Sequence, residues 1–198
     1  MRICFIGSGR LATHLSFKLK QVGCEVVQVY SRTEVSACGL AEVLDCPYTT
    51  DAKSLTDEAD IYICALKDSV IEEVLDQAAK VLKGKILVHT AGSVPSSVLA
   101  KYTDLYGVLY PLQSFSKGKS VDFSKVPIFV EGSSSYVVDT LMSISEKISG
   151  KVYQMASEER KKMHLAAVFV SNFSNHVFAL GEQLVESAGV PFSVLLPL

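Results

Sequence analysis

The chain lacks the features that mark disulfide-stabilised or metal-binding proteins. It contains five cysteines, at positions 4, 24, 38, 46 and 64, and no two of them form a C-x-x-C pair. An odd number without that spacing argues against both a disulfide framework and a cysteine-based metal site. Cys4 and Cys64 fall inside expected strands, where a thiol packs as a small apolar side chain. The cysteine pattern therefore predicts a reduced, cytoplasmic protein without a bound metal.

Excess charge and long apolar runs are also missing. The formal net charge is −2, and no basic run with interleaved aromatic residues occurs. We therefore expect neither nucleic acid nor an anionic membrane surface as a partner. The first residues do not form the charged start and long apolar region of a signal peptide. The longest purely apolar run near the C-terminus, residues 165–170, is too short to cross a bilayer.

The N-terminal stretch carries the most specific motif. An apolar strand expected over residues 2–6 leads into a Gly-x-Gly-x-x-Ala turn that opens a helix. In dinucleotide-binding proteins the first glycine permits the tight turn, and the second lets the backbone approach a pyrophosphate. The helix N-terminus adds free N–H groups and a positive dipole end. The alternative is an ordinary glycine-bearing turn. The predicted pyrophosphate site comprises Gly7, Ser8, Gly9, Arg10 and Leu11.

The end of the second expected strand indicates which dinucleotide is bound. An NAD site has an acidic residue there, which accepts hydrogen bonds from the ribose hydroxyls. This chain instead has Ser31, Arg32 and Thr33 after a tyrosine. Hydroxyl groups and a guanidinium suit a 2′-phosphate, which a carboxylate would repel. The sequence therefore predicts NADP, with Arg10 as a second phosphate contact. The alternative is that Arg32 is solvated and Glu34 takes the place of the acid.

Strand-like and helix-like segments then alternate as far as residue 155. This alternation is typical of a doubly wound α/β sheet, a Rossmann domain. Ligands of such sheets bind outside the carboxyl ends of the strands. We therefore expect the nicotinamide near the ends of later strands, at Leu66, His89, Ser93 and Pro111. The alternative for these residues is ordinary loop structure without a ligand.

A long helix is expected over residues 157–187, as the start of a helical domain that spans residues 156–198. Its middle is mostly apolar but has a polar stripe, because His164, Ser171 and Asn175 are spaced to share one face, with Asn172 beside them. Buried polar groups need partners. These residues either contact other helices or close a substrate pocket. A helix so apolar also needs further helices or a second subunit to cover it.

These segments together resemble the superfamily of Rossmann-plus-helical-domain enzymes. It includes 6-phosphogluconate and hydroxyisobutyrate dehydrogenases, pyrroline-5-carboxylate reductase and the deazaflavin-dependent NADP reductases. Within it, the chain is most similar to a bacterial family of NADP oxidoreductases that has a C-terminal domain of unknown function. The resemblance implies an N-terminal NADP-binding domain, a helical domain that forms homodimers, and more helices after residue 198, so that the chain looks truncated. It is carried by residues 6–12, 29–32, 89–93, 107–115 and 164–175.

The resemblance also bears on catalysis. In the hydroxyacid dehydrogenases a lysine on the first interdomain helix protonates the substrate, with an asparagine nearby. The matching region here has His164 and Asn172 and no lysine, which argues against hydroxyacid chemistry. Histidine readily exchanges protons near neutral pH, so His164 is the expected proton donor. The predicted function is hydride transfer between NADP(H) and a small C=O or C=N substrate. The alternative is a non-catalytic NADP(H) sensor or scaffold.

Overall fold

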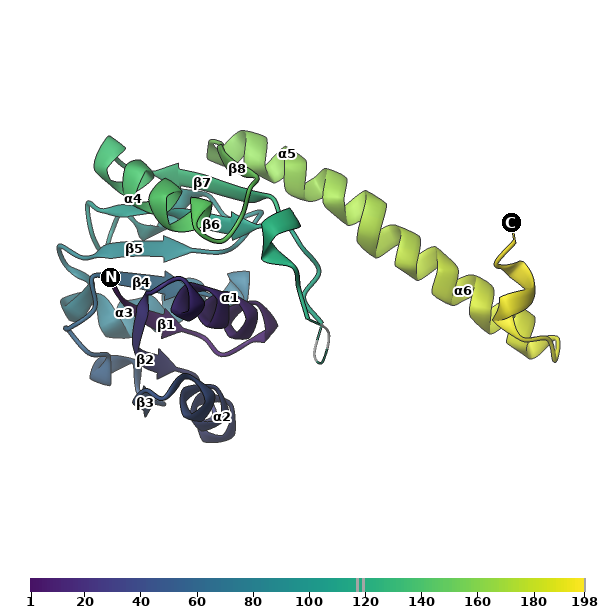
Figure 1. The fold of residues 1–198 in the computed structure, drawn as a ribbon, viewed down its shortest axis with the longest axis horizontal. Helices are drawn as coiled ribbons and strands as arrows, with labels where there is room; N and C mark the ends of the chain where they lie inside the picture. The colour runs from purple at the N-terminus through teal and green to yellow at the C-terminus, as the bar shows by residue number, and fades with distance from the viewer. Residues whose placement is uncertain (117, 119, 198) are drawn as a thin grey trace.

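The computed structural model describes residues 1–116, 118 and 120–197, and its main body is one eight-stranded sheet (Figure 1). The strand order is β3-β2-β1-β4-β5-β6-β7-β8. Neighbouring strands are parallel, except that β6 and β7 are antiparallel. The first six strands in this order match the dinucleotide-binding sheet. The strands are β1 Arg2–Ile6, β2 Glu25–Tyr30, β3 Tyr48–Thr49, β4 Ile61–Cys64, β5 Ile86–His89, β6 Tyr106–Pro111, β7 Ile128–Gly132 and β8 Val152–Gln154.

Helices cover both faces of this sheet, and each face has its own apolar core. One core joins the sheet to helices α1, α2 and α4, and the other joins it to α3. Along β1, Ile3 and Phe5 point into the first core, whereas Cys4 and Ile6 point into the second. Burial on both faces explains why the strands are continuously apolar. The predicted doubly wound α/β fold is confirmed. The helices are α1 Arg10–Gln21, α2 Glu34–Leu44, α3 Ile71–Leu82 and α4 Ser135–Glu146, and the short 3-10 turns are Ala52–Ser54, Asp68–Val70, Ser96–Leu99, Phe123–Lys125 and Phe192–Leu195.

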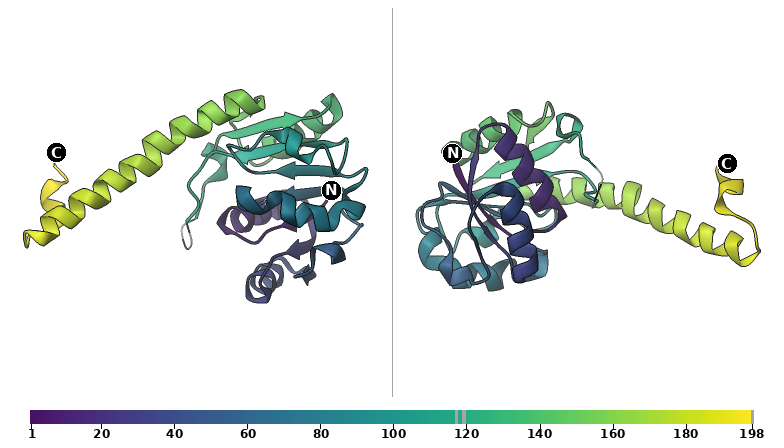
Figure 2. Two further views of the ribbon diagram at one scale, coloured as in Figure 1. Left: turned by 180° about the vertical axis from the view of Figure 1, so that it is seen from behind. Right: turned by 60° about the horizontal axis from the view of Figure 1, so that its bottom comes forward.

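A long helical rod leaves the sheet after β8 and extends away from it (Figures 1 and 2). It comprises α5 (Ser157–Ala167), a π-helical segment (Val168–Phe173) and α6 (Ser174–Ser187) in direct succession. The predicted helix over residues 157–187 is therefore present, although the π-helical segment was not expected. Within the described part of the chain, no helix is both long and apolar enough to cross a membrane.

Candidate functional site

The two glycines of the N-terminal turn have different structural roles. Gly7 has a φ of +118°, and a Cβ added there would lie 2.5 Å from the Ala65 carbonyl oxygen. The fold itself therefore requires glycine at this position. Gly9 precedes α1 with an ordinary φ of −70°, and an added Cβ would meet nothing within 4 Å. The protein leaves open space in front of Gly9, as expected where a pyrophosphate approaches the backbone.

The N-terminus of α1 is open to an anion. No side chain caps its first N–H groups, and its first turn contains no acidic residue. The exposed side chain of Arg10 begins the helix. Uncapped N–H groups and the positive end of the helix dipole favour a bound phosphate. These residues fit the pyrophosphate of a dinucleotide.

The residues after β2 present a free cation. Arg32 is exposed, and its guanidinium has neither a hydrogen bond nor an ion pair to any residue that the structure describes. Ser31 is half-buried beside it, and the Thr33 hydroxyl donates to Ser36 Oγ at 2.8 Å. The Glu34 carboxylate accepts a hydrogen bond from the Tyr48 hydroxyl at 3.2 Å. The residues therefore offer a guanidinium and hydroxyls, which fit a 2′-phosphate.

His89 has a different place from the one the sequence suggests. Its side chain is fully buried. Nδ1 accepts a hydrogen bond from the Ala91 N–H at 3.2 Å, and Nε2 faces the Pro95 carbonyl oxygen at 3.4 Å. Burial lowers the pKa of His89 to about 4, so the ring is neutral and Nε2–H donates to Pro95. The two hydrogen bonds of His89 stabilise the loop after β5. Its ring has no exposed surface for a contact with a cofactor. Complete burial of His89 argues against the predicted contact with the nicotinamide.

The other predicted nicotinamide contacts lie beside this loop. Leu66 follows β4, and its Cδ2 atom would be 3.2 Å from a Cβ added at Gly7. The Ser93 hydroxyl donates to Asp68 Oδ2 at 2.5 Å, which joins the loops after β5 and β4. Pro111 is buried at the end of β6. These loops follow parallel strands, so they share one edge of the sheet with the glycine turn.

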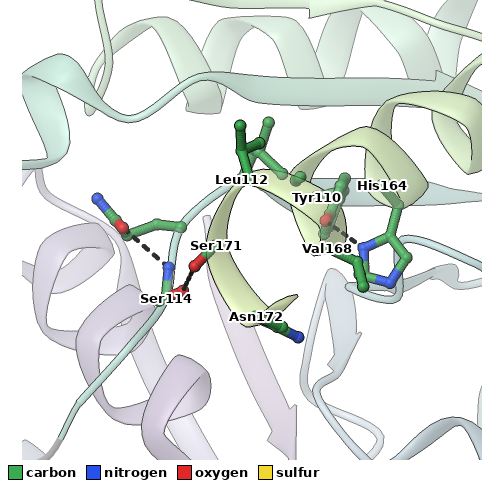
Figure 3. Close-up of a pocket in the computed structure, with 10 residues that line it drawn as sticks. Tyr110, Leu112, Ser114, His164, Val168, Ser171 and Asn172 are labelled. Atoms are coloured by element: carbon green, nitrogen blue, oxygen red, sulfur yellow. Dashed lines mark hydrogen bonds between the residues drawn. The ribbon is translucent and has the colours of Figure 1, made fainter. Parts of the chain in front are cut away.

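A pocket of about 370 Å³ opens between the end of β6 and the helical rod. His164 and Asn172 both line it, as Figure 3 shows, so the structure brings the two predicted catalytic residues together. Asn175, which the sequence placed on the same stripe, is not among its lining residues. A π-helical turn closes on i→i+5 bonds and rotates the residues that follow it. The full lining is Tyr110, Leu112, Gln113, Ser114, His164, Ala167, Val168, Val170, Ser171 and Asn172.

Tyr110 holds the His164 ring within this pocket. The Tyr110 hydroxyl and His164 Nδ1 are 2.7 Å apart, and the two rings meet edge to face at 5.8 Å. Gly92, in the loop after β5, packs against this pair of side chains, because a Cβ added there would lie 2.5 Å from His164 Nδ1. The sequence indicated the segment from Tyr110 onward as part of the active side but gave Tyr110 no role, because its contact with His164 joins distant parts of the chain.

A buried ion pair anchors the start of the rod. Arg160 is 1% exposed and pairs with Glu131 of β7. Its guanidinium also donates to the Val94 carbonyl oxygen in the loop after β5. Burial alone would raise the pKa of Glu131, but hydrogen bonds from Ser96, Ser157 and Arg160 outweigh burial and lower it. Arg160 lies one turn before His164, so the ion pair also fixes where His164 sits.

Comparisons with known proteins agree with this geometry. Residues 2–92 match the family model "NADP oxidoreductase coenzyme F420-dependent", and residues 126–198 match "Domain of unknown function (DUF2520)". Among solved structures, the "putative NADP oxidoreductase" BF3122 from Bacteroides fragilis is 44% identical. The alignment covers 99% of this chain and 76% of that one, with a TM-score of 0.90. A search of curated proteins found no match.

More distant structures share the fold. The imine reductase from Myxococcus stipitatus in complex with NADP+ is 16% identical, with a TM-score of 0.72 over 94% of this chain and 67% of that one. The 1-pyrroline-5-carboxylate reductase from Streptococcus pyogenes is 17% identical, with a TM-score of 0.72 over 98% and 73%. The family predicted from the sequence is confirmed, and its cofactor is the predicted NADP. The chain belongs to the NADP oxidoreductase family that combines a Rossmann-like domain with the C-terminal domain DUF2520.

Proposed function

We propose that the chain transfers hydride between NADP(H) and a small substrate with a C=O or C=N bond. The observation that carries this proposal is the position of the pocket. The glycine turn follows β1, Leu66 follows β4, Ser93 follows β5 and Tyr110 lies at the end of β6. These four strands are parallel, so their carboxyl ends form one edge of the sheet. A dinucleotide bound along that edge would lead from the glycine turn toward the pocket.

In this proposal each group of residues holds one part of NADP. The turn from Gly7 to Leu11 would hold the pyrophosphate at the N-terminus of α1, with Arg10 beside it. Ser31, Arg32 and Thr33 would hold the 2′-phosphate. Leu66 and Ser93 would lie against the nicotinamide. NADPH supplies the hydride when it is bound, and the protein supplies position and proton transfer.

The pocket would hold the substrate between the nicotinamide and the helical rod. His164 and Asn172 would face the reacting bond, with His164 as the proton donor. The distant relatives named imine reductase and 1-pyrroline-5-carboxylate reductase favour a C=N substrate for this chain. The test monitors the oxidation of NADPH by its absorbance. The candidate substrates, each added separately, are a simple cyclic imine such as 2-methyl-1-pyrroline and a panel of small ketones. Tight NADPH binding without oxidation by any probe would instead favour an NADP(H) sensor.

We also propose that residues 1–155 bind NADP and that residues 156–198 belong to a helical domain that pairs with a second copy. The rod carries a series of large apolar side chains that are exposed in the single chain. Their burial by a partner would stabilise a dimer. Sedimentation of the purified chain as a monomer at micromolar concentration would contradict this pairing. The exposed residues are Leu165, Phe169, Val170, Phe173, Val177, Phe178, Leu180 and Leu184.

The cellular location belongs to the same proposal. All five cysteines are free thiols. Free thiols are maintained in reducing compartments. We therefore propose a cytoplasmic enzyme.

Gly9→Ala is expected to weaken NADPH binding at least about tenfold, because the added methyl group would occupy the space of the pyrophosphate. The free energy of unfolding should change by no more than about 1 kcal/mol, the cost of alanine at a helix N-cap. Gly7→Ala is the matched comparison and should destabilise the fold itself, because its Cβ would collide with Ala65. NADPH titration and chemical denaturation measure the two effects separately. Unchanged NADPH affinity in Gly9→Ala would contradict the assignment of the pyrophosphate site.

A further inference from the structure

Tyr110 and His164 form a pair with a defined geometry. Tyr110 is fixed in the sheet, because β6 pairs it with Phe129 of β7 and its ring packs 6.3 Å from the Phe129 ring. Its side chain is buried, with 8% exposed. His164 comes from α5 and brings Nδ1 to 2.7 Å from the Tyr110 oxygen. Strand and helix thus meet in one hydrogen bond at the wall of the pocket (Figure 3).

The direction of this hydrogen bond follows from the surroundings of Tyr110. Burial raises the pKa of Tyr110 to about 12, so the phenol keeps its proton near neutral pH. A buried hydroxyl needs an acceptor, and His164 Nδ1 is the acceptor that the described residues provide. When the phenol donates to Nδ1, the neutral imidazole carries its own proton on Nε2. Among those residues, Nε2 has no hydrogen-bond partner.

The loop after β5 limits how far the pair can move. A Cβ added at Gly92 would lie 2.8 Å from Tyr110 Cζ and 2.6 Å from His164 Cγ. The backbone at Gly92 therefore touches both rings and leaves little room for another His164 conformer. Behind them, Arg160 and its partner Glu131 hold the first turn of α5. Together, Gly92 and the Arg160–Glu131 ion pair hold His164 in place, so that its Nδ1 atom stays within hydrogen-bond distance of the Tyr110 hydroxyl.

We propose that Tyr110 is a positioning residue that fixes His164 as the Nε2–H tautomer and gives Nδ1 a proton as His164 donates its Nε2 proton. This proposal rests on the proposed hydride transfer. When hydride adds to the substrate carbon, the π electrons of the C=O or C=N bond move to its oxygen or nitrogen. That atom takes the Nε2 proton, and Nδ1 takes the Tyr110 hydroxyl proton. Nε2 then takes a proton from a solvent water, which leaves as hydroxide, and the Nδ1 proton returns to the Tyr110 oxygen, so that the starting tautomer is restored. A neutral imidazole N–H can stabilise such developing negative charge.

The charges around the pair are compatible with this transfer. The Arg160 guanidinium acts against burial and lowers the pKa of Tyr110, whereas the Asp68 carboxylate raises it. Glu131 compensates the charge of Arg160 through their ion pair. His89, on the neighbouring strand, remains neutral because burial lowers its pKa. Of these charged groups, Arg160 is the one that acts in favour of a transient phenolate at Tyr110.

Nitrogen-15 NMR of the histidine rings tests the tautomer without any substrate. In the folded wild-type chain at a pH where His164 is neutral, we expect a protonated Nε2 and an unprotonated Nδ1. The signal is assigned by its loss in His164→Gln, since the chain has four histidines. Tyr110→Phe keeps the ring and removes the hydroxyl, so its His164 should show both tautomers in exchange. Tyr153→Phe, an exposed tyrosine that also packs on Phe129, should leave the His164 signal unchanged.

Kinetics separate this proposal from the proposed function. With 2-methyl-1-pyrroline as the probe, Tyr110→Phe should lower kcat about 10–100-fold and leave NADPH affinity unchanged. Wild-type kcat in Tyr110→Phe, together with its loss in His164→Ala, would overturn the role of Tyr110 and leave the proposed function intact. A protonated Nδ1 in the wild-type spectrum would overturn it even if the variant failed to fold. Wild-type kcat in both variants would contradict the proposed role of His164 as well.

Discussion

His164→Ala is expected to lower NADPH-dependent turnover by about 10²–10⁴-fold, the usual contribution of a positioned general acid. The dissociation constant of NADPH should stay within about twofold of the wild-type value, because His164 lies on the helical wall of the pocket and away from the glycine turn. The expected loss is thus confined to kcat, as for an interaction made only in the transition state. Steady-state kinetics and NADPH titration measure the two quantities.

A matched control exists on the same rod. His176 lies on α6, is exposed and is not among the residues that line the pocket. His176→Ala therefore removes the same kind of side chain from the same helical rod and should leave turnover unchanged. Asn172→Ala, which does alter the pocket, should have an intermediate effect. Equal turnover in His164→Ala and the wild type would remove His164 from the mechanism and favour the sensor.

Arg160→Met is expected to lower the free energy of unfolding by about 3–5 kcal/mol, the cost of leaving one charge of a buried pair without its partner. Arg160 is almost completely buried, and its removal would leave the Glu131 carboxylate facing an apolar thioether. The same variant should detach the first turn of α5 and so displace His164. Chemical denaturation measures the stability change.

Two further variants test whether the lost partner causes the effect. Arg160→Met combined with Glu131→Leu removes both charges and should recover much of the lost stability, since apolar replacement of a whole buried pair is often neutral. Lys101→Met breaks an exposed pair with Glu72 and Asp76, and exposed pairs contribute only about 0–1 kcal/mol. A similar loss in Arg160→Met and Lys101→Met would contradict the structural importance of the buried pair.

Much of the fold could be predicted because its signals are local. The glycine turn, the apolar strands and the helix over residues 157–187 are each readable from a short stretch of residues. The antiparallel direction of β7 was not readable, because an apolar strand has the same pattern in either direction. The π-helical segment was missed because nothing in the residues of Val168–Phe173 marks a wider turn. Of the predicted polar stripe, His164 and Ser171 line the pocket and Asn175 does not.

The candidate site could be predicted only in part from the sequence, because the role of each residue depends on its burial and on partners that are distant in the sequence. His89 and His164 are both histidines in suggestive positions, yet His89 is fully buried and His164 lines the pocket. The pairing of Arg160 with Glu131 joins residues 29 positions apart, and that of Tyr110 with His164 joins residues 54 positions apart. Such contacts appear only when the sheet and the helix are assembled. In contrast, the proposal for Arg32 could be made from the sequence, because it depends on a local strand end and on the absence of an acid there.

Calorimetric titration of the purified chain with NADPH and NADH tests the central claim most directly. We expect NADPH to bind about 10–100-fold more tightly, which corresponds to charge-assisted hydrogen bonds of about 1.5–3 kcal/mol to the 2′-phosphate. Arg32→Ala should remove most of this preference by weakening NADPH binding and leaving NADH binding unchanged. Tighter binding of NADH by the wild-type chain, or an unchanged preference in Arg32→Ala, would contradict the assignment of NADP to this site.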